Sequence, residues 1–106
     1  MKAKLRPWVR PPVSLLMSRV WAAGDGVVVF AGPADGGLGN TVVIQHVGGI
    51  QSVYAHLDEV RTVCLSDVTA GRVIGTLGQT GDAAGPFLYF EIREGGFPMN
   101  PQMYLP

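Results

Sequence analysis

Short apolar runs separated by glycine-rich turns dominate the chain from Gly24 onward. Runs of this kind, rich in β-branched and aromatic side chains, are typical of strands, and no segment shows the period of a long amphipathic helix. The predicted strands are Gly26–Ala31, Thr41–His46, Gln51–His56, Gly71–Leu77 and Phe87–Arg93. The pattern therefore predicts an all-β domain.

The second and third of these strands are close enough in sequence to form a hairpin. Residues 47–50 read Val-Gly-Gly-Ile, a glycine-containing loop between two β-rich runs. A four-residue loop places His46 opposite Gln51 and Thr41 opposite His56. We expect the hairpin to have this register.

Side chains alternate between the two faces of a strand, so the sequence also predicts which residues lie together. In the last strand one face is apolar and is expected to face the core, with Leu88, Phe90 and Ile92. The other face carries Phe87, Tyr89, Glu91 and Arg93. In the strand that ends at His56, the same rule places Ser52, Tyr54 and His56 on one face.

Residues 1–22 differ in character from the rest of the chain. They are basic and proline-rich, and we interpret them as a lead-in to a domain at residues 23–106. Residues 13–22 fit either a short strand or a helical turn. No apolar run is long enough to span a membrane, and no signal peptide is recognisable.

Composition narrows the range of partners. The 106 residues carry eight acidic and eight basic side chains, which predicts no strong attraction to nucleic acid. Cys64 is the one cysteine, so no intrachain disulfide forms.

Five segments, in order, resemble the M23 (LytM-type) zinc peptidases, which cut peptidoglycan. They lie within the run from Gly24 to Leu105, which makes up about three-quarters of the chain, and are Gly26–Gly32, Gly39–His46, Tyr54–Leu57, Ala70–Gly81 and Gly85–Glu91, followed by Asn100-Pro101 and Tyr104-Leu105. The resemblance implies a small LytM-type β-sandwich (the duplicated hybrid motif), here lacking its first strands. Residues 88–93 are also similar to non-catalytic domains of the EnvC-type murein hydrolase activators.

The departures from the family pattern concern its zinc site. The family's last active-site strand reads Gly-Pro-His-Leu-His-Phe-Glu, and Phe87 and Tyr89 replace its two histidines. The upstream His-x-Gly-x-Asp motif, which supplies two further zinc ligands, has no counterpart before Gly24. Of the usual active-site residues His56 remains. The resemblance thus implies a groove without catalytic residues, metal or cofactor, carrying Tyr54, His56, Phe87, Tyr89 and Arg93.

The two histidines of the chain cannot replace the lost site together in the predicted register. His46 and His56 lie about five residues apart along the ladder, roughly 17 Å, and on opposite faces. A zinc site would need His56 with two carboxylates, for example Glu91 and Asp82. Tyr89 is a poor substitute for histidine because a phenol ionises only near pH ~10.

These observations lead to one main hypothesis and two alternatives. The main one is a non-catalytic LytM domain that regulates or activates a peptidoglycan hydrolase, with a cell-wall amidase or another envelope protein as partner. The alternatives are a module that binds peptidoglycan without cutting it, and an M23 metallopeptidase with unusual ligands. By resemblance the protein belongs in the periplasm or cell envelope.

Overall fold

The computed structural model describes residues 2–4, 19–81, 88–95 and 97–99. Within these residues the chain forms strands and one 3₁₀ turn and has no α-helix, which confirms the all-β prediction. The elements are β1 (Lys2–Lys4), β2 (Arg19–Trp21), β3 (Gly26–Ala34), β4 (Gly39–Gln45), η2 (Val47–Gly49), β5 (Ile50–Leu57), β6 (Asp67–Val68), β7 (Val73–Thr76), β8 (Tyr89–Glu94) and β9 (Phe97–Met99).

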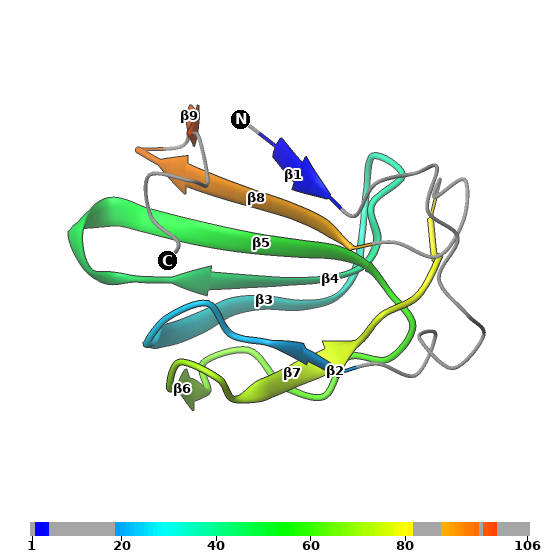
Figure 1. Cartoon of the computed structure of the whole chain (residues 1–106), viewed down its shortest axis with the longest axis horizontal. Helices are drawn as coiled ribbons and strands as arrows, with labels where there is room; N and C mark the ends of the chain where they lie inside the picture. The colour runs from blue at the N-terminus through cyan, green and yellow to red at the C-terminus, as the bar shows by residue number, and fades with distance from the viewer. Residues whose placement is uncertain (1, 5–18, 82–87, 96, 100–106) are drawn as a thin grey trace.

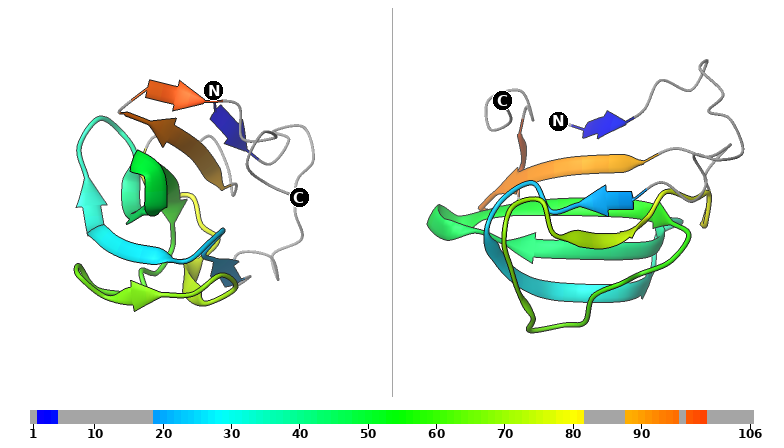
Figure 2. Two further views of the ribbon diagram at one scale, coloured as in Figure 1. Left: turned by 90° about the vertical axis from the view of Figure 1, so that its left-hand side faces the viewer. Right: turned by 60° about the horizontal axis from the view of Figure 1, so that its bottom comes forward.

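The strands form two sheets. The larger has seven strands in the order β1-β8-β5-β4-β3-β6, and β9 also pairs with β8. The smaller consists of β2 and β7, so the segment left open between strand and helical turn contains a strand. Figure 1 shows the large sheet with β2 and β7 beside its lower part, and in the right-hand view of Figure 2 this small sheet lies in front of the large one.

The apolar core lies between the two sheets. One buried cluster joins both, with Val20 from β2, Ile74 from β7, and Val28, Val42, Ile44, Tyr54, Phe90 and Ile92 from the large sheet. The alternation predicted for the last strand is confirmed, because Phe90 and Ile92 face this core. Burying apolar surface at about 25 cal/mol per Å² is the main force that holds the sheets together. The face of the large sheet that carries this cluster is called the core face below, and the opposite one the outer face.

The β4–β5 hairpin differs from its predicted register by one residue. The turn is η2 rather than a four-residue loop, the amide of His46 bonds the carbonyl of Ile50 at 2.7 Å, and Gln45 pairs with Gln51. The predicted pairing of His46 with Gln51 is therefore wrong. The physical reason is the pair of glycines: Gly48 and Gly49 adopt φ angles of 80° and 75°, which lets the chain reverse one residue earlier.

The register shifts again near the end of the hairpin. Val42 pairs with Tyr54, but Asn40 pairs with Leu57, so one residue of β4 faces two of β5 there. This is a β-bulge, and His56 within it has a φ of 61°. A residue other than glycine in this region is strained by roughly 1–2 kcal/mol. The bulge changes the direction of the His56 side chain, with consequences for the site.

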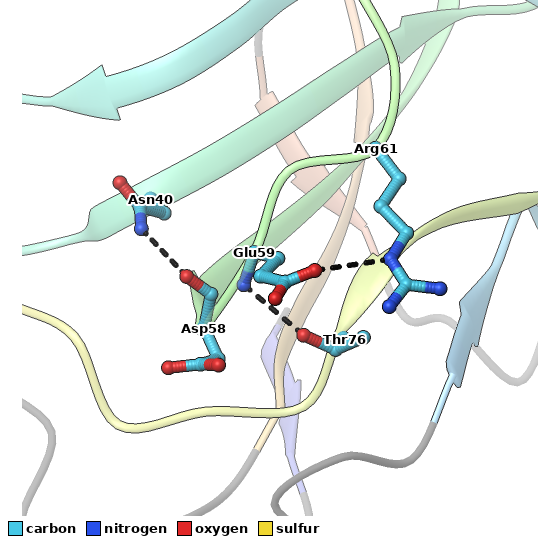
Figure 3. A network of polar contacts seen from close by, with 5 residues as sticks. All are labelled: Asn40, Asp58, Glu59, Arg61 and Thr76. Carbon is cyan, nitrogen blue, oxygen red and sulfur yellow. Dashed lines mark hydrogen bonds and ion pairs between the residues drawn. The ribbon is translucent and has the colours of Figure 1, made fainter.

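A polar network ties the connection after β5 to both sheets (Figure 3). The Asn40 side-chain amide donates to the Asp58 carbonyl at 3.1 Å, and the Glu59 amide donates to Thr76 Oγ1 at 3.1 Å. The Arg61 guanidinium pairs with Glu59 at 3.1 Å on the exposed side. Through these bonds residues 58–61 link β4 of the large sheet to β7 of the small one.

Candidate functional site

A groove lies on the outer face of the large sheet. Its volume is about 290 Å³, and it is lined by Val29, Phe30, Ala34, Leu38, Thr41, Val43, Gln51, Val53 and Arg93. These residues come from β3, β4, β5, β8 and the β3–β4 loop. We call this feature the outer-face groove.

The strand pairing explains why the floor of the outer-face groove is apolar. Val43 of β4 pairs directly with Val53 of β5, so two branched side chains stand side by side. In β3 the register shifts between Val28 and Phe30. Val28 is fully buried in the core, whereas Phe30 is 39% exposed and lines the groove.

Polar groups mark the end of the groove on β5 and β8. Arg93 pairs with Gln51 across the two strands, and both line the groove. A cation beside an apolar floor suits a ligand with an apolar group next to an acidic or carbonyl group.

A buried carboxylate organises β8 beside this end. Glu91 is 1% exposed, and the Tyr89 hydroxyl donates to its Oε2 at 2.6 Å. The Arg93 Nε donates to its Oε1 and forms an ion pair with it. All three side chains lie on the outer face, as alternation predicted. Glu91 thus satisfies its buried charge through Tyr89 and Arg93.

The Tyr89 phenol is held in its protonated form. Burial raises the pKa of Tyr89 above its ordinary value of 10.0, and the hydrogen bond and negative charge of Glu91 raise it further, while Arg93 lowers it. The hydroxyl proton is engaged by the carboxylate at neutral pH. Tyr89 can therefore donate a hydrogen bond there, but it offers no phenolate to a metal ion.

His56 lies next to Tyr89 because of the bulge in β5. The two rings contact each other edge to face, with centroids 5.9 Å apart. The His56 Nδ1–H donates to the Thr80 carbonyl at 2.7 Å, which fixes the orientation of the imidazole ring. His56 is 6% exposed. The predicted proximity of His56 and Tyr89 is thus present in the structure.

Tyr54 lies on the other side of the sheet, and its predicted place in the groove is wrong. Tyr54 pairs with Phe90 across the two strands, and their ring centroids lie 5.3 Å apart. The residue is 1% exposed and belongs to the core. Alternation from Tyr54 would have put His56 on the same face. The bulge at His56 breaks that alternation, so the two side chains separate.

The remaining predicted site residues divide as follows. Arg93 lines the outer-face groove, whereas Phe87 and Asp82 lie outside the described residues. The sequence did not predict the apolar floor formed by Val43 and Val53, or the exposed Phe30 beside it. A signal for it existed: period-two alternation places Thr41 and Val43 on the face opposite Val42 and Ile44, both fully buried in the core.

His46 and His56 have separate surroundings. His46 bonds Ser52 and the Asp25 carbonyl, whereas His56 bonds Thr80 and contacts Tyr89. Among the residues that the structure describes, no group of three histidine, cysteine or carboxylate side chains is arranged to hold a metal ion.

Comparison with known proteins places the chain in a family. A model of peptidase family M23 matches residues 16–101. The chain belongs to peptidase family M23. Its structure is similar to that of the catalytic domain of the prophage-encoded M23 protein EnpA from Enterococcus faecalis, with a TM-score of 0.77 and 28% identity over 83% of this chain and 70% of that one. Both findings confirm the LytM-type fold inferred from the sequence.

Relatives within the M23 family carry names of two kinds. The DD-carboxypeptidase/endopeptidase Mpg of Neisseria meningitidis is 44% identical over 77% of this chain and 19% of its own length. The murein hydrolase activator NlpD of Escherichia coli is 44% identical over 80% of this chain and 22% of its own length. The chain thus spans about a fifth of these relatives. Overall identity does not separate a peptidase from an activator, so the site residues have to do so.

The described donor set does not fit the catalytic zinc ion that the M23 resemblance implies. Such a zinc takes three protein ligands and keeps one open position. Tyr89 stands where the resemblance places a histidine ligand, and its proton is held by Glu91. His56 donates through Nδ1 to a backbone carbonyl, so it could offer a metal at most its Nε2, and one imidazole does not make up the three ligands.

No helix among the described residues has the length and apolar character needed to cross a bilayer.

Proposed function

We propose that this M23 domain regulates a peptidoglycan hydrolase by binding it through the outer-face groove, and that it does not cleave peptidoglycan itself. The observation that carries the proposal is the state of Tyr89. At the position of a family zinc ligand stands a protonated phenol that is tied to a buried carboxylate. The Glu91 carboxylate fixes the positions of Tyr89 and of Arg93, which lines the outer-face groove, and the phenol supplies no metal ligand.

The outer-face groove has the character of a protein-binding surface. It combines an exposed aromatic side chain, Phe30, with a branched apolar floor and one arginine. Aromatic and arginine side chains are enriched among the residues that dominate binding energy at interfaces. Glu91 holds Arg93 in one orientation, so less side-chain entropy is lost when a partner binds.

The names of relatives support the class of partner. The Escherichia coli relative is named a murein hydrolase activator. Transferred to this chain, that name suggests a cell-wall hydrolase as the partner, with a peptidoglycan amidase as the specific candidate, and a location in the cell envelope. A relative of the same identity is named a peptidase, so the test has to measure cleavage as well as activation.

The test mixes the purified protein with a peptidoglycan amidase from the same organism and dye-labelled cell-wall sacculi. The protein alone is expected to release no dye, and the amidase is expected to release dye faster when the protein is present. Phe30→Ala removes an exposed wall of the groove and should weaken the activation by roughly tenfold or more. Val63→Ala is the matched control, because Val63 is 68% exposed and does not line the groove.

Circular dichroism of both variants establishes that they remain folded. Zinc-dependent dye release by the protein alone would overturn the proposal in favour of a metallopeptidase. Sedimentation with sacculi without any effect on the amidase would overturn it in favour of a module that binds peptidoglycan. Equal activation by the Phe30 and Val63 variants would reject the outer-face groove as the binding surface.

A further inference from the structure

A continuous chain of hydrogen bonds joins the β2–β3 turn to β5 on the core face, away from the outer-face groove. The Ala23 amide bonds the Tyr54 hydroxyl at 2.8 Å, and this hydroxyl bonds Ser52 Oγ at 2.8 Å. Ser52 Oγ bonds His46 Nε2 at 2.7 Å, and His46 Nδ1 bonds the Asp25 carbonyl at 2.7 Å. The chain thus begins and ends on the same turn.

The two ends of this chain determine the direction of every bond in it. A backbone amide can only donate and a carbonyl can only accept, so Ala23 donates to Tyr54 and His46 donates through Nδ1 to Asp25. A neutral His46 then accepts at Nε2 from Ser52, and Ser52 in turn accepts from Tyr54. All of these groups are satisfied, and among the described residues no buried side-chain nitrogen or oxygen lacks a partner.

A second proton on His46 disrupts this order. Both ring nitrogens of an imidazolium donate, so Ser52 Oγ must then accept from His46. Either Ser52 turns its hydrogen toward Tyr54, whose own hydrogen loses its acceptor, or Tyr54 still donates and the Ser52 hydrogen loses its acceptor. Ser52 is 0% and Tyr54 1% exposed, so water does not replace the lost partner. A buried donor without an acceptor is strongly unfavourable.

We propose that His46 is a pH-sensitive latch, which holds the β2–β3 turn on β5 while its imidazole is neutral and releases the turn when the imidazole is protonated. His46 is only partly buried, so protons reach it from solvent. Movement of the turn away from β5 opens the buried hydroxyls to water and removes the penalty. β2 begins the same segment and pairs with β7, so the release also loosens the small sheet.

The charged and titratable groups around His46 do not prevent release of the turn when the imidazole is protonated. From the turn, Asp25 contributes a carboxylate that accepts from the Ala70 amide at 2.8 Å. Its attraction for an imidazolium opposes release, but Asp25 is exposed and solvent screens the attraction. From β5 the titratable group is Tyr54, whose pKa burial raises, so that it stays neutral. Arg72, in the connection between β6 and β7, contacts the β2–β3 turn through its backbone carbonyl, which accepts from the Ala22 amide.

Amide hydrogen exchange tests the latch directly. Exchange of the Ala23 and Val28 amides is measured by NMR at about pH 7 and about pH 5.5, a range in which histidine is the side chain that changes charge. Each rate is divided by the intrinsic rate at that pH. Protection of Ala23 is expected to fall by roughly tenfold at the lower pH, which corresponds to one buried donor without an acceptor. Val28, whose amide bonds the Ser66 carbonyl, is expected to keep its protection.

The two histidines of the chain provide matched variants. His46→Gln should abolish the pH dependence of Ala23 protection, and His56→Gln should retain it. Ser52→Ala interrupts the chain with His46 in place and should also abolish the pH dependence, which covers the case in which His46→Gln does not fold. Equal protection of Ala23 at both pH values in the unsubstituted protein would overturn the proposal. So would a pH dependence that survives both His46→Gln and Ser52→Ala.

Discussion

Replacement of Glu91 by glutamine is expected to be among the most destabilising conservative changes on the outer face. Glu91 is a buried carboxylate that accepts from both Tyr89 and Arg93. Glutamine has the same size but offers one acceptor oxygen, so one of the two donors faces an amide group that also donates. Both interactions lose the negative charge that strengthens them, and if the new amide nitrogen faces Tyr89, the Tyr89 hydroxyl accepts from it and its own hydrogen loses the acceptor that Glu91 provided.

The magnitude follows from the burial of the two partners. A hydrogen bond to a charged group contributes roughly 1.5–3 kcal/mol. The Glu91 side chain is 2% exposed, whereas that of Arg93 is 36% exposed, so solvent screens part of the ion pair. We therefore expect Glu91→Gln to lower the free energy of unfolding by about 2 to 3 kcal/mol. For a domain of this size, that corresponds to a fall in Tm of roughly 10 °C.

The chain contains a matched control for this prediction. Glu59 and Arg61 have the same spacing and the same Nε-to-carboxylate contact as Glu91 and Arg93, but they are 57% and 46% exposed (Figure 3). An exposed ion pair contributes about 0–1 kcal/mol, so Glu59→Gln should change stability little.

Urea unfolding followed by circular dichroism measures both variants. Equal and small effects of Glu91→Gln and Glu59→Gln would refute the reasoning, because they would mean that the Glu91 carboxylate does not hold Tyr89 and Arg93 in place.

Three further outcomes are expected. The raised pKa values of Tyr54 and Tyr89 mean that the unfolded chain loses its phenolic protons first as the pH rises, so stability should be complete below the ordinary value of 10.0 and decline above it. Urea midpoints at about pH 9 and about pH 11 test this, and Tyr89→Phe should flatten the decline. Gly78→Ala should lower the free energy of unfolding by about 2 kcal/mol or more, because the new methyl group would lie 2.6 Å from the Asp58 Cα. At Gly48 an added methyl group meets no atom within 4 Å, so Gly48→Ala should lower it by only about 1 kcal/mol, the strain of a positive φ. A melting curve that ranks these two variants in the opposite order would contradict the packing around Gly78. Elemental analysis of the purified protein should find less than about a tenth of an equivalent of zinc, and added zinc should leave the Tm unchanged; a stoichiometric content would mean that the chain binds metal through ligands other than the described ones.

The sequence by itself determined the fold class and much of the chemistry. Period-two alternation correctly placed Phe90 and Ile92 in the core and Tyr89, Glu91 and Arg93 on the opposite face, because side-chain direction along a regular strand depends on local geometry alone. The motif order also identified the family, since residues such as those of Tyr54–Leu57 recur at fixed positions of one scaffold.

Only the tertiary structure decided where regularity ends. The two glycines of η2 moved the hairpin register by one residue, and the bulge at His56 separated that side chain from Tyr54. Both features depend on backbone conformations that several loops stabilise together. The His56 amide, for example, bonds the Leu38 carbonyl, and its ring bonds the Thr80 carbonyl, contacts between residues that are distant along the chain. A single irregular residue reverses the face of every position after it, so strand periodicity could not predict which side of the sheet would carry His56.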